Sequence, residues 1–159
     1  MDNNEQRFKE MIVRHKDFIW HICESYRMGA TWEVSDMFQE VLCMLWRYYP
    51  GFDGRSGERT WIYKVANNTL ISLKRRAINR QQTNDTVPEQ YYNDDRTEYN
   101  DLMQLIETLE EKDYCIVKAH LDGFDYAEIA EMVGISVAAV SMRLSRAKRK
   151  LRKMYEDGK

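Results

Sequence analysis

Residues 125–152 (DYAEIAEMVGISVAAVSMRLSRAKRKLR) constrain the fold most, because they have the pattern of two helices joined by a tight turn. The first helix has one apolar stripe, made of Tyr126, Ile129, Ala130 and Val133. Gly134 then ends that helix, and Ser136 is a candidate N-cap for the next. The second helix has its own inward stripe of Val140, Leu144, Ala147 and Leu151. A small residue, a flexible turn and a branched residue in this order are typical of a helix-turn-helix.

The second of these helices is strongly basic. Residues 137–153 carry seven basic side chains and no acidic one. A helix with this charge, held against a short supporting helix, suits a DNA major groove lined by phosphates. A helical hairpin with a merely solvated basic face is the alternative. DNA binding is the preferred interpretation, because turn chemistry, spacing and charge agree.

Composition favours a mostly helical chain, since 159 residues include only two prolines and seven glycines. Cys23, Cys43 and Cys115 have no zinc-site spacing, and no catalytic set of side chains is recognisable. We therefore expect buried, reduced thiols, no cofactor or metal, and no enzymatic activity. No apolar run of about eighteen residues occurs, which predicts a cytoplasmic protein without a membrane span or signal peptide.

Two amphipathic helices are predicted in the first third of the chain. The first spans residues 5–28, and the second begins near Thr31 or Ser35 and ends at Tyr49. The expected buried stripe of the second helix is Met37, Phe38, Val41, Leu42, Leu45, Trp46 and Tyr49. Its opposite face carries Asp36, Gln39, Glu40, Cys43 and Arg47, beside Met44 and one edge of Trp46. Such a mixed face suits a protein interface.

A third helix is predicted over residues 61–76, capped by Thr60 after a glycine-rich loop at 51–59. Its outward face combines a ring, amides and cations: Tyr63, Lys64, Asn67, Asn68, Ser72 and Arg75, with Arg59 and Trp61 at the loop end. Rings stack on unpaired bases, amides read base edges and cations hold phosphates. We expect this face to bind single-stranded DNA. For Trp61, a core position at the helix start is the alternative.

Residues 81–100 have little periodicity and many acidic side chains, which predicts a flexible acidic linker. Two further helices are predicted at residues 101–109 and 112–121, with Leu102 and Leu121 among their inward residues. The predicted fold is therefore all-α. It has two small helical domains, residues 1–80 and 101–159, joined by the linker.

The order of these parts resembles the extracytoplasmic-function sigma factors, the minimal two-domain specificity subunits of bacterial RNA polymerase. DMFQEVLCMLW is similar to their polymerase-clamp-binding segment. TWIYKVANNTLISLKRR is similar to the helix that melts and reads the −10 element. DYAEIAEMVGISVAAVSMRLSRAKRKL is similar to the region 4 helix-turn-helix that reads the −35 element. The resemblance implies a sigma factor that binds core polymerase, recognises both promoter elements and promotes DNA melting.

The resemblance assigns residues to three surfaces. The implied polymerase-binding residues are Asp36, Gln39, Glu40, Leu45 and Trp46. The implied −10 residues are Arg59, Trp61, Lys64, Asn67, Asn68, Ser72 and Arg75. The implied −35 residues are Ser136, Ala139, Ser141, Met142, Arg143, Arg146, Lys148 and Arg149. The chain departs from the family pattern at Ser141, where a basic residue is common, and at the double amide Asn67-Asn68.

The implied partners are bacterial core RNA polymerase, contacted at its clamp and its flap, promoter DNA and an anti-sigma factor. In the family the acidic linker follows the path of nascent RNA through the polymerase. In this chain that linker contains Asp85, Glu89, Asp94, Asp95 and Glu98, with Asp101 just beyond it, and an inert tether is an equal alternative. A helix-turn-helix regulator that acts without core polymerase is the alternative function. Such a regulator has no need of the basic, aromatic helix at residues 61–76.

Overall fold

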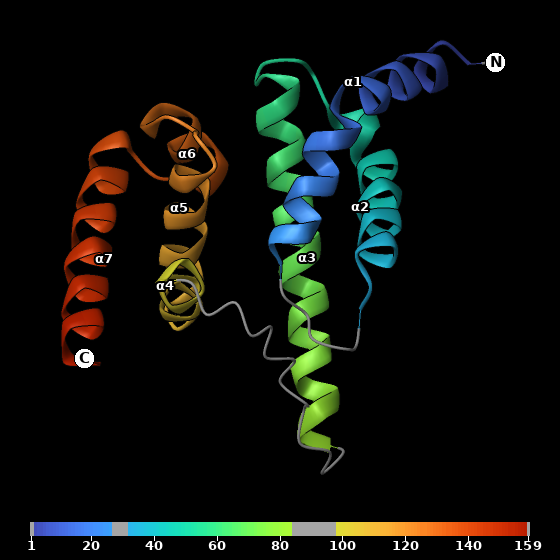
Figure 1. The fold of residues 1–159 in the computed structure, drawn as a ribbon. Coiled ribbons are helices and arrows are strands. Elements are labelled where there is room, and N and C mark those ends of the chain that lie inside the picture. Colours follow the sequence, from blue (N-terminus) through green and yellow to red (C-terminus); the bar gives the residue numbers. More distant parts are fainter. Residues whose placement is uncertain (1, 27–31, 84–97, 159) are drawn as a thin grey trace. The chain divides into compact units, whose positions relative to one another are not determined.

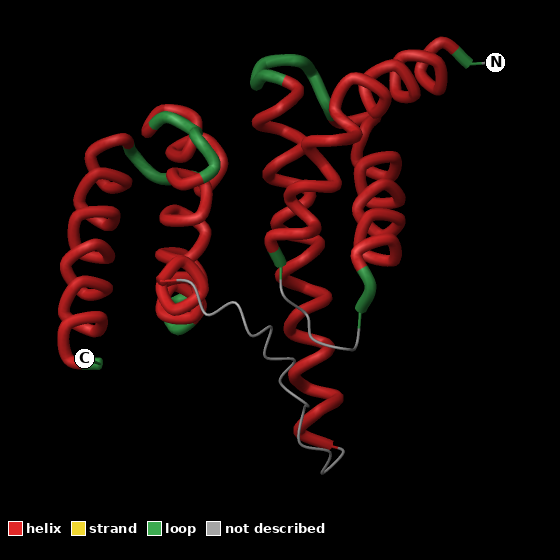
Figure 2. Tube along the Cα trace, viewed as in Figure 1, coloured by secondary structure: helices red, strands yellow, loops and turns green. Residues whose placement is uncertain are grey.

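The computed structural model describes residues 2–26, 32–83 and 98–158. These residues form seven α-helices and one 3₁₀ turn, and Figure 2 shows no strand among them. The chain divides into two compact units, Met1–Tyr91 and Tyr92–Lys159. The prediction of an all-α protein built from two helical units is confirmed.

The first unit is a three-helix bundle of α1 (Asn3–Ser25), α2 (Val34–Tyr48) and α3 (Glu58–Thr83), with a 3₁₀ turn at Tyr49–Gly51. Each of the three helices contacts the other two. In Figure 1, α1 crosses α3, and α2 runs alongside α3. The apolar stripes meet in a core that includes Met11, Ile19, Ile22, Val41, Leu45, Ile62 and Leu70. The bundle forms because each helix has one apolar face and buries it against the other two.

Several predicted helix boundaries in this unit are wrong. Helix α2 follows Glu33 without a side-chain cap, so Ser35 is not its cap, and Thr31 lies outside the described residues. Helix α3 begins at Glu58, before the predicted cap Thr60, which is buried inside the helix. It also continues to Thr83, because no glycine or proline follows the predicted end to stop it. The acidic residues predicted to lie in the linker between 84 and 97 are outside the described part of the chain.

The second unit consists of α4 (Glu98–Glu107), α5 (Glu111–Leu121), α6 (Tyr126–Val133) and α7 (Val137–Asp157). Helix α7 contacts each of the other three and so organises the unit. The inward stripe predicted for it is confirmed, since Val140, Leu144, Ala147 and Leu151 are all buried. They pack with core residues that include Ile106, Ile116 and Ile129.

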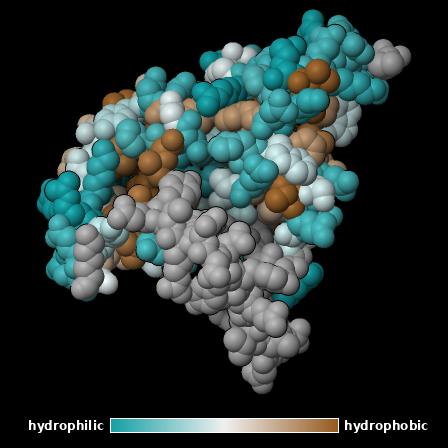
Figure 3. All heavy atoms as spheres, viewed as in Figure 1, coloured by the Kyte–Doolittle hydropathy of each residue, from teal (hydrophilic) through white to brown (hydrophobic). Residues whose placement is uncertain are grey.

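Some side chains predicted to be buried are exposed. Leu121 is 56% exposed at the last position of α5, and Leu102 is also exposed. Cys43 is exposed while Cys23 is buried, so the prediction of buried thiols is wrong for Cys43. The helical phase places Cys43 one turn from Gln39, on the polar face of α2. Figure 3 shows a largely hydrophilic visible face, interrupted by hydrophobic patches.

Candidate nucleic-acid interface

The outward face of α3 lies beside a groove that α2 helps to form. Lys64, Asn68, Ser72 and Arg75 are exposed on this helix. The groove encloses about 470 Å³, and α3 lines it with Trp61, Lys64, Val65, Asn68, Thr69, Ser72, Leu73 and Arg76. Glu40, Met44, Tyr48 and Gly51 line the remainder. A ring, an amide, a hydroxyl and cations converge on one hollow, and these are the groups that hold an unpaired base and its phosphates.

Two residues of α3 that were predicted to face outward are buried. Tyr63 is almost fully covered, and its ring lies 6.2 Å from that of Phe18 in α1. Asn67 is buried as well, and its Oδ1 accepts a hydrogen bond from the hydroxyl of Tyr26. The cause is α1, which packs across this flank of α3 and leaves a narrower exposed face than a free helix would have. Asn67 therefore joins α3 to the end of α1, and Asn68 is the exposed member of the double amide.

Trp61 is partly buried in a row of aromatic rings at the loop end of α3. Its ring centroid lies 4.8 Å from that of Phe52 and 6.3 Å from that of Tyr49. Tyr49 in turn lies 5.2 Å from Phe8 of α1. Trp61 also lines the groove. The ring of Trp61 therefore packs inside the unit, as the alternative interpretation expected, and its −10 role stays a prediction for a residue that borders the candidate DNA site.

An ionic contact joins α1 to the first residue of α3. Arg14 Nη2 donates to Glu58 Oε1 at 2.8 Å, and His15 Nε2 lies 2.8 Å from Glu58 Oε2. We call these three residues the Glu58 clasp. Partial burial acts to raise the pKa of Glu58, but the hydrogen bonds from His15 and Arg14 and their charges outweigh it and hold the pKa below its ordinary value. The carboxyl is therefore ionised at neutral pH.

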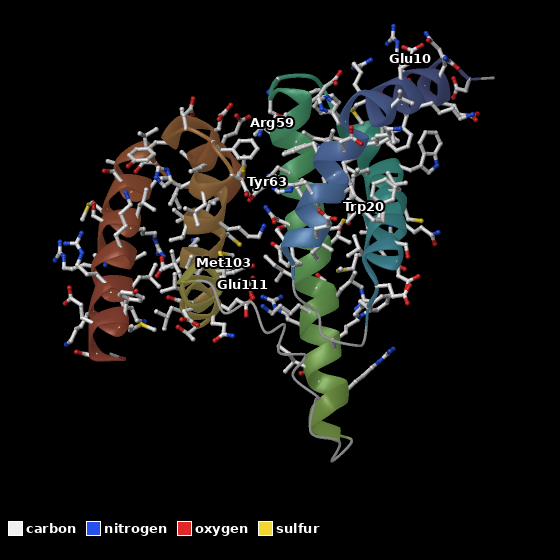
Figure 4. The ribbon with its side chains drawn as sticks, in the orientation of Figure 1. Glu10, Trp20, Arg59, Tyr63, Met103 and Glu111 are labelled. Atoms are coloured by element: carbon white, nitrogen blue, oxygen red, sulfur yellow. The ribbon has the colours of Figure 1, made fainter. Side chains whose placement is uncertain are left out.

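The neighbouring Arg59 contacts α1 through a ring. Its guanidinium carbon lies 4.7 Å from the ring centroid of Phe18, which is cation–π geometry. Figure 4 labels Arg59 and Tyr63 on the part of α3 that α1 crosses. Arg59 remains exposed beside the loop.

The predicted polymerase-binding residues of α2 fall into two groups. Asp36, Gln39 and Glu40 are exposed, and we call these three the outer face of α2. Trp46 is 48% exposed, although it was placed in the buried stripe, and its ring lies 4.9 Å from that of Phe8. Leu45 is 0% exposed, so its assignment as a contact residue is corrected to a core position. Leu45 follows Val41 by one helical turn, which puts it on the inward stripe.

The helix-turn-helix has the predicted local structure. Asp125 caps α6 and forms a capping box with Glu128, with hydrogen bonds of 2.8 and 2.9 Å. Gly134 ends α6 at a φ of +76°, a conformation that a side chain would disfavour. Ser136 caps α7 by accepting from the Ala139 amide at 3.1 Å. The oxygen of Ser136 is therefore already used inside the protein.

The exposed face of α7 centres on residues other than Arg143. Met142 is 62% exposed, and Arg146, Lys148 and Arg149 are also exposed. Arg143 instead lies beside α5, where its Nη1 donates to Asp113 Oδ1 at 3.1 Å. Ser141 and Ala139 are only partly exposed. Ser145 was not predicted, yet it is exposed and follows Met142 by three positions, a spacing that could have revealed it.

The second unit also has an apolar groove of about 510 Å³. Its lining includes Leu102, Ile106, Val117, Leu121, Leu144 and Leu151, with Lys148 and Arg152 among the polar members. The groove explains why Leu102 and Leu121 are exposed, because they border a hollow that no described residue fills. An open apolar surface of this kind is typical of a protein contact.

Each of the two units matches a known protein family. Residues 11–80 match the family "Sigma-70 region 2", and residues 99–151 match "Sigma-70, region 4". The ECF RNA polymerase sigma factor SigW of Bacillus subtilis is 24% identical, and the match covers 97% of this chain and 91% of SigW. The chain belongs to the extracytoplasmic-function sigma factors. Region 2 of this sigma factor thus comprises most of α1, all of α2 and α3 to Arg80, and region 4 comprises α4 to α7 as far as Leu151.

Two further matches agree with this assignment. SigG of Mycobacterium tuberculosis is 38% identical over 52 residues, which is 32% of this chain and 14% of SigG. The solved structure of CnrH in complex with the cytosolic domain of CnrY has a TM-score of 0.70 and 21% sequence identity. It covers 99% of this sigma factor and 92% of that chain, and CnrH is a sigma factor of Cupriavidus metallidurans. At this identity the likeness shows that the two share a fold. Within the described ranges, no helix of this sigma factor is long and apolar enough to span a membrane.

Proposed function

We propose that this sigma factor attaches to core RNA polymerase through the outer face of α2, opens the −10 element with α3 and reads the −35 element with α7. The observation that carries this proposal is the groove between α2 and α3. Trp61, Lys64, Asn68 and Ser72 line it together with Glu40 of the outer face of α2. A surface for unpaired DNA thus adjoins a surface for protein. A regulator that reads only duplex DNA has no use for this combination.

The −35 element is read by the exposed face of α7, with Met142, Ser145 and Arg146 toward the bases and Lys148 and Arg149 toward phosphates. Residues near the N-terminus of a recognition helix usually reach base edges, and later cations reach the backbone. The apolar groove of region 4 supplies a second attachment, to the polymerase flap. The protein acts in the cytoplasm as a binding subunit, and the polymerase supplies the catalysis.

An anti-sigma factor is a further expected partner. CnrH was solved with the cytosolic domain of CnrY, and a sigma factor RpoE was solved with the anti-sigma factor NepR from Bartonella quintana. A partner of this kind would cover the outer face of α2 or the apolar groove of region 4. In that position it would compete with core polymerase for this sigma factor.

The test is run-off transcription with purified bacterial core polymerase and promoter DNA selected from random sequence by the reconstituted holoenzyme. We expect transcripts that start at one position and require this sigma factor. The two proposed DNA sites should appear as two conserved blocks in the selected sequences. Selection of one palindromic block without core polymerase would instead support the regulator that acts alone.

A further inference from the structure

The loop between the 3₁₀ turn and α3 is exposed but attached at both ends. Asp53, Gly54, Arg55 and Gly57 are all exposed. At the near end, Phe52 packs on Trp61. The ion pair between Arg55 and Asp53 lies within the loop, so it does not attach the loop to the rest of region 2. At the far end the loop meets α3 at Glu58, and attachment there depends on what Glu58 contacts.

Glu58 contacts α1 with both of its carboxylate oxygens. Its partners Arg14 and His15 come from a helix more than forty residues earlier in the chain, each at 2.8 Å. Immediately after Glu58, Arg59 lies over the ring of Phe18. Consecutive residues at the start of α3 are therefore held by successive turns of α1. These contacts between α1 and α3 fix the end of the loop and the position of Arg59.

The negative charge of Glu58 has to be offset by its partners, because it lies next to a surface proposed to hold phosphates. Residues 59–80 of α3 contain no acidic side chain, as a surface that holds phosphates requires. Glu58 is the acidic residue that directly precedes this stretch, and an uncompensated carboxylate there would repel the DNA backbone. Arg14 and His15 hold the carboxylate toward α1, and the guanidinium of Arg14 offsets its charge.

We propose that Glu58 is a positioning residue for promoter opening, because the Glu58 clasp holds the loop at residues 51–57 and Arg59 at the end of α3 where Gly51 and Trp61 line the groove proposed for unpaired DNA. This inference rests on the proposed −10 role of α3. A loop that is already ordered loses less conformational entropy when DNA binds, so more binding energy remains for opening the duplex. Glu58 itself does not contact DNA.

The test compares Glu58→Ala with the matched control Glu5→Ala in full-length protein bound to bacterial core polymerase. Glu5 also accepts from a cation, Lys9, at 2.7 Å and has similar exposure, but this pair lies within α1 and does not reach α3. We expect Glu58→Ala to keep its affinity for core polymerase and its closed-complex affinity. Its rate of promoter opening should fall about three- to tenfold, the range for losing charge-assisted hydrogen bonds at a partly exposed site. A template with a pre-melted bubble should restore the wild-type rate.

Hydrogen exchange measures the positioning directly. Amides of residues 51–60 should exchange faster in Glu58→Ala than in the wild type, and those of Glu5→Ala should be unchanged. If Glu58→Ala folds poorly, the charge-swapped double variant Arg14→Glu with Glu58→Arg decides the matter, because it restores an ion pair between the same positions. Rescue of opening by the swap supports the proposal.

The outcomes separate this inference from the function on which it rests. If the wild-type holoenzyme opens no promoter, the proposed function fails. If the wild type opens DNA and Glu58→Ala opens it equally fast, the positioning role is overturned and the function stands. Failure of the charge swap to restore opening also overturns the positioning role.

Discussion

Arg143 and Arg146 lie three positions apart on α7 and differ in what surrounds their guanidinium groups. Arg143 binds Asp113, whereas Arg146 is exposed. We expect Arg146→Ala to weaken −35 DNA binding by about 1–3 kcal/mol without changing the melting temperature of the protein. Arg143→Ala should instead lower the Tm by about 1–5 °C, because it breaks a partly exposed ion pair between helices, and should lower DNA affinity less than Arg146→Ala does. Binding titrations and thermal unfolding of both variants measure the two effects.

Comparing the two variants tests whether Arg143 and Arg146 have different roles. An unchanged Tm in Arg143→Ala would mean that its pair with Asp113 adds no stability, and only the sequence-based assignment of Arg143 to the −35 surface would then remain. Equal DNA affinity of Arg146→Ala and the wild type would remove Arg146 from the proposed reading face.

Protonation of Glu58 links the Glu58 clasp to acid stability. The pKa of Glu58 is lowered in the folded state, so in the acid range the unfolded chain binds more protons at this residue. The contribution of the clasp is therefore complete above the ordinary glutamate pKa of about 4.3 and is lost as the pH falls through the lowered folded value. We expect the wild type to have a higher Tm than Glu58→Gln at neutral pH, and the difference to shrink progressively as the pH falls below the ordinary glutamate value. A difference that stays equally large throughout the acid range would contradict this cause.

At the scale of a helix, α2 carries its proposed polymerase-binding residues and its core residues on different faces. Gln39→Ala combined with Glu40→Lys should weaken core polymerase binding and leave far-UV circular dichroism unchanged, because both side chains are exposed. Leu45→Ala should lower the free energy of unfolding by about 2–5 kcal/mol, because the fully buried side chain leaves a cavity. Full core affinity in the double variant would show that the outer face of α2 is not the polymerase site.

On α3 the double amide allows a similar comparison. Asn68→Ala combined with Lys64→Ala should leave the closed complex intact, since α7 still holds the −35 element, but should abolish melting. Melting is measured as permanganate reactivity of unpaired thymines, and a pre-melted bubble template should restore transcription because the energy of unpairing is no longer needed. Asn67→Ala should instead destabilise region 2, because it removes the buried amide oxygen that accepts the hydrogen bond from the Tyr26 hydroxyl. If the double variant melts promoters as the wild type does, α3 has only a packing role.

The helices of this protein could be predicted from sequence because their signals are local. The αL glycine at 134, the N-cap at Ser136 and the stripe from Val140 to Leu151 all depend on neighbours within a few positions. The faces of α3 could not be predicted as well. Tyr63 and Asn67 are buried by α1, and only the packing of helices distant in sequence determines how much of a helix surface is covered. For the same reason, the contact of Arg143 with Asp113 of another helix could not be predicted from the sequence.

For the whole molecule, the net charge of −2 is the sum of unevenly distributed charges, and the proposed −35 surface is strongly basic. Seven cations and no acid lie within residues 137–153, so the local field at α7 is strongly positive. We expect the affinity for −35 DNA to fall steeply with salt, as counterion release requires. Lys150→Ala should reduce the slope of log K against log salt concentration by about 1 while leaving base preference unchanged. A slope that is insensitive to this substitution would place Lys150 away from the phosphates.

Chemical labelling of the exposed Cys43 thiol can report when a partner binds to α2. Cys43 lies on the same side of α2 as Gln39 and Glu40, whereas Cys23 is buried and Cys115 is only partly accessible. A small alkylating reagent should therefore modify Cys43 first in the unmutated protein. When core polymerase or an inhibitory partner covers that side of α2, the labelling rate should drop. Occupancy of the site can then be followed over time by mass spectrometry, without any substitution in the chain.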